Sequence, residues 1–309
     1  MDTTDTAEHF ARLVPKKALT SPILLNAVLA LSARHLARTA NYDPEAAEFF
    51  HSACIELLIP ALSDQASAAA DPNILAATVI LRIYEQLNVS MTGADDERHL
   101  WGTTALVDLQ PFFHAPTAGG IRQAAFWVFI RQDIYMALIH QRPMRCDLDS
   151  FNVDVTFVSG DDSTWANWAI WILARIVQFC FGLQERTWEK WSVLNELMDT
   201  WEQCRPMSFT PYFHKERNVE EKLYFPVMYH WDRIQGTSQS DRFLWILEVI
   251  RTPGSLADAN YSHWVAVFSY RTHVAGNLRS TKLQRPRRPG TPKSAKKTPS
   301  TPPLFLSSN

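Results

Sequence analysis

Apolar residues recur at steps of three and four along much of the chain, which is the period of an amphipathic α-helix. The densest stretch, residues 165–182, reads WANWAIWILARIVQFCFG. Its large apolar residues keep to these steps: Trp165, Trp168, Trp171, Ile172, Ile176 and Phe179. A bilayer-spanning helix needs roughly 20 apolar residues without a charge at mid-depth, and Arg175 lies in the second half of this stretch. The pattern therefore predicts a helix in the core of a folded domain.

Three helix starts share one signature, an N-cap residue followed by proline. The pairs are Ser21-Pro22, Asp43-Pro44 and Asp71-Pro72. Each pair predicts a helix that begins at its proline. The second of these helices is expected to end or kink near Pro60, because proline lacks the N–H that a helix interior needs.

The same periodicity predicts four more helices. They cover residues 95–110, 120–142, 188–204 and 220–234, the last interrupted at Pro226. One of them carries a stripe that we predict to be core: Trp188, Trp191, Leu194, Met198 and Trp201. Residues 143–162 and 207–218 lack the period and are expected to be irregular.

The fold class predicted from these elements is all-α, with antiparallel helix pairs packed in one large helical domain. Strand-like alternation is nearly absent, and no fixed repeat length supports a solenoid. We expect residues 1–20 to lead into the domain, 21–235 to form it and 236–278 to be partly helical. Residues 279–309 are rich in proline and have no helical period, so they are expected to form a disordered tail.

The charge of the chain is unevenly distributed. The formal net charge is -2, but residues 279–309 hold eight Lys or Arg and no Asp or Glu. Residues 1–278 therefore carry 22 basic and 32 acidic residues, a net charge of -10. Because DNA phosphates attract basic surfaces, this acidic body is not expected to bind DNA directly.

The cysteines give no sign of a metal site. Cys54, Cys146, Cys180 and Cys204 are far apart and form no CxxC pair, so we predict reduced, buried thiols and no zinc. The first residues lack the apolar run of a secretory signal, and an intracellular location without membrane contact is therefore expected.

Candidate catalytic chemistry is weak. Asp95, Asp96 and Glu97 open a predicted helix, where acidic residues complement the positive helix N-terminus. An all-α enzyme of the isoprenoid cyclase type, with magnesium at Asp95-Asp96, is the alternative.

Asp147 and Asp149 form a DxD in a turn-rich loop, where backbone capping is the favoured role. With histidines that fall singly and no GxSxG or P-loop motif, we predict a non-enzymatic chain that holds no metal or cofactor.

Charged residues inside two apolar helices require partners. Arg131, Gln132 and Asp133 are consecutive in the predicted helix 120–142, and Arg175 is a single charge in the stretch 165–182. Because a buried charge is costly unless it is paired, we predict that Arg175 contacts a carboxylate in the core. A structural role is favoured over ligand binding for all four residues.

The tail holds a candidate nuclear import signal, because two clusters of basic residues are separated by a short spacer. The clusters are Arg285, Arg287 and Arg288, then Lys293, Lys296 and Lys297. Thr291, Thr298 and Thr301 each precede proline, so they are candidate phosphorylation sites for a proline-directed kinase. The alternatives are a basic tail without a function and a segment that results from an error in gene prediction.

Four segments, read in order, resemble the regulatory domain of fungal zinc binuclear cluster transcription factors, the fungal-specific transcription factor domain of type 2. They are VPKKALTSPILLNAVLALSARHL, RQDIYMALIHQRP, DDSTWANWAIWILARIVQFCFG and TWEKWSVLNELMDTWEQCRPMSFTPYF. The resemblance covers roughly residues 8 to 235 and is carried by the ordered set, since each segment alone is a buried helix face. Beyond about Gln235 the resemblance is lost.

The resemblance implies a helical domain C-terminal to a DNA-binding module, in nuclear regulators of RNA polymerase II transcription. In such proteins six cysteines hold two zinc ions and contact DNA, and four scattered cysteines cannot build that cluster. We therefore expect the zinc-binding module to be missing from this chain. The resemblance further implies protein partners in the transcription machinery, a small-molecule effector and scope for a homodimer. A helical scaffold that binds only proteins is a further alternative.

Overall fold

The computed structural model describes residues 1–92, 95–109, 116–210, 213–215 and 227–229. By its internal contacts the chain divides into two units, Met1–Val265 and Ala266–Asn309, and all described residues belong to the first. None of the described helices is long and apolar enough to cross a membrane.

The described part of the first unit is mainly helical. The longer helices are α3 (Pro22–Thr39), α4 (Pro44–Ala61), α6 (Pro72–Thr92), α7 (Arg98–Asp108), α8 (Gly120–His140), α9 (Asp162–Phe181) and α10 (Trp188–Cys204). The short elements are α1 (His9–Arg12), α2 (Val14–Ala18), α5 (Gln65–Ala70), the 3-10 turns η1 (Leu148–Ser150) and η2 (Met207–Phe209), and the strands β1 (Phe213–Lys215) and β2 (Val227–Tyr229). The predicted all-α class is confirmed.

The three helix starts marked by proline are confirmed. The Ser21 side chain accepts a hydrogen bond from the backbone N–H of Leu24 at the start of α3. Asp43 and Asp71 do the same for the second helical residue of α4 and α6, at 2.9 and 2.8 Å. The helix α4 ends one residue after Pro60, as predicted.

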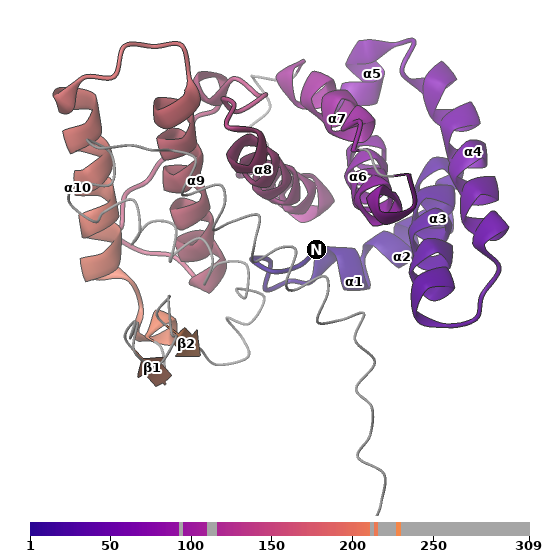
Figure 1. The fold of residues 1–309 in the computed structure, drawn as a ribbon, viewed down its shortest axis with the longest axis horizontal. Helices are drawn as coiled ribbons and strands as arrows, with labels where there is room; N and C mark the ends of the chain where they lie inside the picture. The colour runs from indigo at the N-terminus through magenta and orange to yellow at the C-terminus, as the bar shows by residue number, and fades with distance from the viewer. Residues whose placement is uncertain (93–94, 110–115, 211–212, 216–226, 230–309) are drawn as a thin grey trace, which may run out of the picture. The chain divides into compact units, whose positions relative to one another are not determined.

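The helices pack side by side, and several contacts join helices that are not consecutive in the sequence (Figure 1). The hairpin of α3 and α4 packs through α3 on α6, and α6 contacts both α7 and α8. On the other side of α8 lies the hairpin of α9 and α10. The short helix α1 returns to α8 from the N-terminal segment.

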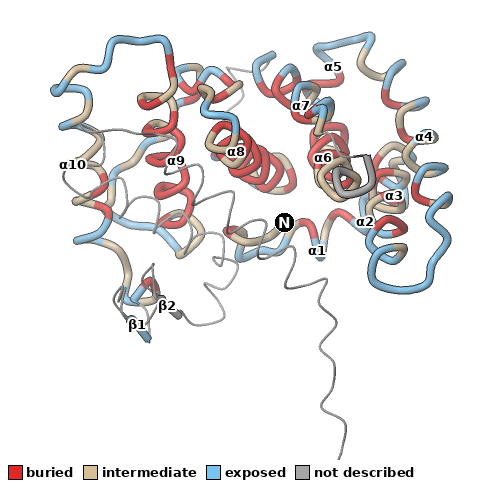
Figure 2. Tube along the Cα trace, in the orientation of Figure 1, coloured by how far each residue is buried: buried red, intermediate tan, exposed pale blue. Residues whose placement is uncertain are grey.

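The helices α8 and α9 are buried along most of their length. They contain 14 and 13 buried residues, and both traces are red along most of their length in Figure 2. The prediction of a core helix around residues 165–182 is confirmed. Because both helices are buried on nearly all sides, neither shows a clear polar face in its sequence.

Two sequence predictions near the end of the described chain are wrong. Residues 227–229, inside the predicted helix 220–234, form strand β2, which pairs antiparallel with β1 inside the predicted irregular segment 207–218. Pro226 removes a helical N–H and disfavours helical backbone in the residue before it, while Val227 and Tyr229 favour extended backbone. The rest of the predicted helix lies outside the described residues.

The predicted core stripe of α10 is buried only at its C-terminal end. Met198 and Trp201 are buried, and the Trp201 indole donates a hydrogen bond to the Trp165 carbonyl at 2.9 Å. Trp188 is 76% exposed, so the prediction is wrong there. The cause is that α10 is the outer helix of its hairpin and packs mainly on α9, which covers one face.

Three of the four cysteines are buried free thiols, as predicted, but Cys204 is exposed at the last residue of α10. Burial raises the pKa of Cys54 to about 12 and that of Cys180 to about 11. Burial also raises the pKa of Cys146 well above its usual value. The thiolate is the reactive form of cysteine. These three thiols are therefore unreactive for two reasons: they are buried, and their raised pKa values keep them protonated.

We predict that a water-soluble disulfide reagent labels one thiol per native chain promptly, and the other three only after unfolding, because Cys204 is the single exposed cysteine. Mass spectrometry of the labelled peptides checks the site. A Cys204→Ser variant should show no prompt labelling. Prompt labelling of Cys54, Cys146 or Cys180 in that variant would contradict the described packing.

Candidate functional site

The acidic residues before α7 bind arginines. Both carboxylate oxygens of Asp95 accept hydrogen bonds from the buried Arg82 guanidinium, at 2.6 and 2.7 Å. Asp96 pairs with Arg98 at the surface. The first N–H groups of α7 donate to Glu85 of α6, while the three acids stand directly before the helix, where they complement its positive N-terminus. With Asp95 bound to Arg82, magnesium binding by Asp95-Asp96 has no structural support.

The DxD motif has the turn-capping role predicted for it. Asp147 accepts hydrogen bonds from the Asp149 N–H at 3.0 Å and from the Ser150 hydroxyl at 2.8 Å. Asp149 forms an ion pair with Arg175, the carboxylate contact predicted for that arginine. The predicted burial is wrong, because the two side chains are 63% and 40% exposed. Arg175 therefore lies on the one partly open side of α9.

The polar triplet of α8 is buried, and its two charges have separate surroundings. Asp133 accepts from the Arg142 guanidinium at 3.0 Å and from the Arg145 N–H at 2.7 Å. Arg131 donates to the Thr4 hydroxyl at 2.6 Å and to the Met1 carbonyl at 2.8 Å. Gln132 lies between them, and neither of its amide atoms has a hydrogen-bond partner among the described residues.

Two histidines that are far apart in sequence meet between α4 and α7. The Nε2 atoms of His51 and His99 are 3.1 Å apart, and the His51 ring stacks on Tyr84. Burial, together with the charges of His51, Arg82 and Arg98, lowers the pKa of His99 to about 4. Burial also lowers the pKa of His51. Within the described ranges, no group of three or more His, Cys, Asp or Glu residues could hold a metal ion.

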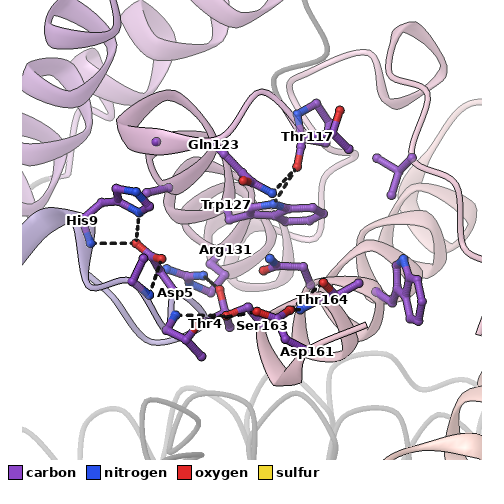
Figure 3. Close-up of a pocket in the computed structure, with 18 of the residues that line it drawn as sticks. Thr4, Asp5, His9, Thr117, Gln123, Trp127, Arg131, Asp161, Ser163 and Thr164 are labelled. Carbon is purple, nitrogen blue, oxygen red and sulfur yellow. Dashed lines mark hydrogen bonds and ion pairs between the residues drawn. The ribbon is translucent and has the colours of Figure 1, made fainter. Parts of the chain in front are cut away.

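A cavity of about 560 Å³ lies where the N-terminal segment meets α8 and α9 (Figure 3). Its lining comes from residues 1–9, from 116–131 and from 152–168. The volume falls within the range of about 300–1,000 Å³ that is typical of small-molecule sites. It is therefore the candidate functional site of the described chain.

The walls of the cavity are held by hydrogen bonds. The Trp127 indole donates to the Pro116 carbonyl at 3.3 Å, and the Trp168 indole donates to the Asp154 carbonyl at 3.0 Å. The Thr6 N–H donates to the Ser163 hydroxyl at 3.0 Å, which joins the N-terminal segment to the start of α9. Because both indole N–H groups are already bonded, the tryptophans offer their ring surfaces to the cavity.

Arg131 supplies a buried positive charge to this cavity. In Figure 3 it reaches toward Thr4, beside Asp5 and His9. Both of its described acceptors are neutral oxygens, and the nearby carboxylates of Asp2 and Asp5 act on it through their charges without a described hydrogen bond. Burial lowers the pKa of Arg131 to about 10, a shift that the charges of Asp2 and Asp5 oppose. The guanidinium is therefore still protonated at neutral pH.

Asn167 of α9 is the second buried polar side chain in the lining. It is 7% exposed, and its Oδ1 atom has no hydrogen-bond partner within the described part of the chain. Sequence analysis singled out Arg131 without placing it in a cavity, and it gave Asn167 no role. The sequence does show a polar residue inside an apolar helix. This pattern indicates that the residue is buried, but it does not show which residues surround it.

All described helices and strands lie within one family match. A family model for the fungal specific transcription factor domain matches residues 2–234 of the 309 residues. The chain belongs to the fungal specific transcription factor domain family. No curated protein and no solved structure matches it. In this fungal specific transcription factor domain, every residue that lines the cavity except Met1 falls inside the match.

The candidate import and phosphorylation sites of the tail lie outside the described residues, and they stay predictions. The same holds for the expected boundaries at residues 236–278 and 279–309.

We predict that His99 makes folding stability depend on pH. In the folded chain His99 stays neutral down to about pH 4, whereas in the unfolded chain it takes up a proton below its ordinary pKa of 6.5. The unfolded state then binds more protons between these values, so stability is lost as the pH falls from 6.5 toward 4. His99→Gln should lose less stability than the wild type between pH 7 and pH 5, measured by urea unfolding.

The control is His35→Gln, which replaces an exposed histidine of α3. Equal losses of stability in the wild type and in His99→Gln would contradict this role of His99.

Proposed function

We propose that this chain is the regulatory part of a fungal RNA polymerase II transcription factor, and that it responds to a small-molecule effector or a protein partner without catalysing a reaction. Membership of the fungal specific transcription factor domain family supports a regulatory role in transcription. Domains of this family are generally non-catalytic. The observation that carries the proposal is the cavity inside the family domain, with a buried charge that lacks an ionic partner.

The mechanism that we propose is a shift between two states of the N-terminal segment. Residues 1–7 are joined to α8 and α9 by polar contacts from Arg131 and Ser163. In the family that this chain resembles, the DNA-binding module precedes the helical domain, so this segment lies on the side of that module. A ligand that binds one state of the segment better than the other would change the population of the active state.

DNA contact is proposed to come from a zinc cluster module and not from the helical domain. Residues 1–278 carry a net charge of -10, which disfavours direct contact with phosphates. The described cysteines are single free thiols, and zinc is expected in that separate module. Partners in the transcription machinery and a location in the nucleus complete the proposal.

Tethering the chain to a promoter tests the regulatory function. The full chain, fused to an unrelated DNA-binding domain, should change reporter transcription several-fold relative to that domain alone, because the family domain would act on the machinery once it is placed there. A fusion with Ala30→Asp, which puts a charge into the buried face of α3, is the unfolded control. Equal reporter levels for all three proteins, at equal abundance, would favour a scaffold that binds only proteins.

Removing the basic clusters tests the location. Deletion of residues 285–297 from a fluorescent fusion should abolish nuclear accumulation, because it removes Arg285, Arg287, Arg288, Lys293, Lys296 and Lys297. Deletion of residues 298–309 keeps all six and serves as the control. Phosphorylation at Thr291, Thr298 or Thr301 would lower the positive charge and weaken import. Nuclear accumulation without residues 285–297 would exclude the import role.

A further inference from the structure

We infer that the cavity between the N-terminal segment, α8 and α9 binds a small monocarboxylate that also carries a hydroxyl or amino group and has an apolar or aromatic body. The inference deepens the proposed function, on which its regulatory meaning rests. The binding itself stands on the residues that line the cavity, and it can be measured without a transcription assay.

The carboxylate is assigned by Arg131. A guanidinium carries five N–H donors in a planar fork that matches a carboxylate, and the described contacts of Arg131 engage only two of its nitrogens. Its acceptors are a hydroxyl and a carbonyl, which form no ion pair with it, and the nearby charges of Asp2 and Asp5 offset the cost of its burial only in part. A buried charge without a partner is costly, so an anion that reaches Arg131 gains both hydrogen bonds and charge neutralisation.

The hydroxyl or amino group is assigned by Asn167. A buried acceptor left without a donor costs about 1–3 kcal/mol, and native chains rarely keep one. The Oδ1 atom of Asn167 is such an acceptor, and Asn167 faces the same cavity as Arg131. A ligand that donates to Asn167 while its carboxylate binds Arg131 satisfies two buried polar groups of the cavity lining.

The body and the total charge of the ligand follow from the rest of the lining. Trp127 and Trp168 present ring surfaces with fixed orientation, which suits an apolar or aromatic body. Three carboxylates line the cavity: Asp5, which is bonded to His9, and Asp154 and Asp161, which are both exposed. Because like charges repel, these carboxylates disfavour polyanions such as sugar phosphates or dicarboxylates. One negative charge, bound at Arg131, is what the site accepts.

Calorimetric titration of the full chain tests each part of the ligand separately. The probes are 3-phenyllactate, phenylalanine, 3-phenylpropionate and phenethylamine, which share a ring and differ in the polar groups. We expect 3-phenyllactate or phenylalanine to bind, 3-phenylpropionate to bind about tenfold more weakly because it lacks the donor, and phenethylamine not to bind because it lacks the carboxylate. If 3-phenyllactate binds more tightly than phenylalanine, the site prefers a hydroxy acid, and the reverse order indicates an amino acid. Equal binding of phenethylamine, or no binding of any probe, would overturn the inference.

A pair of matched variants separates binding from folding. Asn167→Leu removes a side chain with no described hydrogen bond, so its melting temperature should equal or exceed that of the wild type, while the affinity for the bound probe falls at least tenfold. Gln132→Leu removes another buried amide without described partners, one that does not line the cavity, and should keep full affinity. Arg131→Lys keeps the charge but loses the fork, and should weaken binding. Full affinity in Asn167→Leu would refute its role in binding.

The same variants distinguish this inference from the proposed function. If Asn167→Leu abolishes probe binding while the tethered chain still changes reporter transcription as the wild type does, the binding site is supported and its role in regulation is excluded. If the reporter responds and no probe binds, the regulatory function stands and the assignment of the ligand fails.

Discussion

The structure depends on how α8 buries two opposite charges that are two residues apart. Each residue turns a helix by about 100°, so Arg131 and Asp133 point to nearly opposite sides of α8. Arg131 binds the N-terminal segment, and Asp133 binds Arg142 and the backbone of Arg145. Removing one partner of a buried charge costs about 3–5 kcal/mol. The two charges therefore determine which distant segments can pack on α8.

The two buried charges of α8 have different kinds of partner on its two sides. On the side of Asp133, Arg142 and Arg145 also donate to Glu97, which holds the start of α7 against the end of α8. These arginines lower the pKa of Glu97 although burial raises it, and Glu97 keeps a left-handed backbone with φ 52°. This network leaves no described charge without a partner. On the side of Arg131, the acceptors are neutral and a cavity remains. The first side is built for stability and the second has room for a ligand.

Local signals in the sequence predicted local structure well. The capped starts at Pro22, Pro44 and Pro72 depend on contacts within one helical turn, and α9 shows its burial in its composition. The exposure of Trp188 and the strand β2 depend on what packs nearby, which no periodicity reveals. The cavity was beyond prediction for the same reason, because its lining joins residues more than 150 positions apart, as in the contact of Thr6 with Ser163. The sequence marked Arg131 and Asp133 as equivalent, and only the fold distinguishes them.

The N-terminal segment is joined to the rest of this site chiefly by polar contacts. Its helix α1 has four residues, and residues before it are attached mainly through side-chain hydrogen bonds, whereas α8 and α9 are held by buried packing. Segments with few buried contacts open at the lowest free energy. Thr4, Asp5 and His9 form part of the cavity wall, so an occupant of the cavity contacts the docked segment. In the proposed mechanism, such an occupant changes the population of the docked segment by its difference in affinity for the docked and released states.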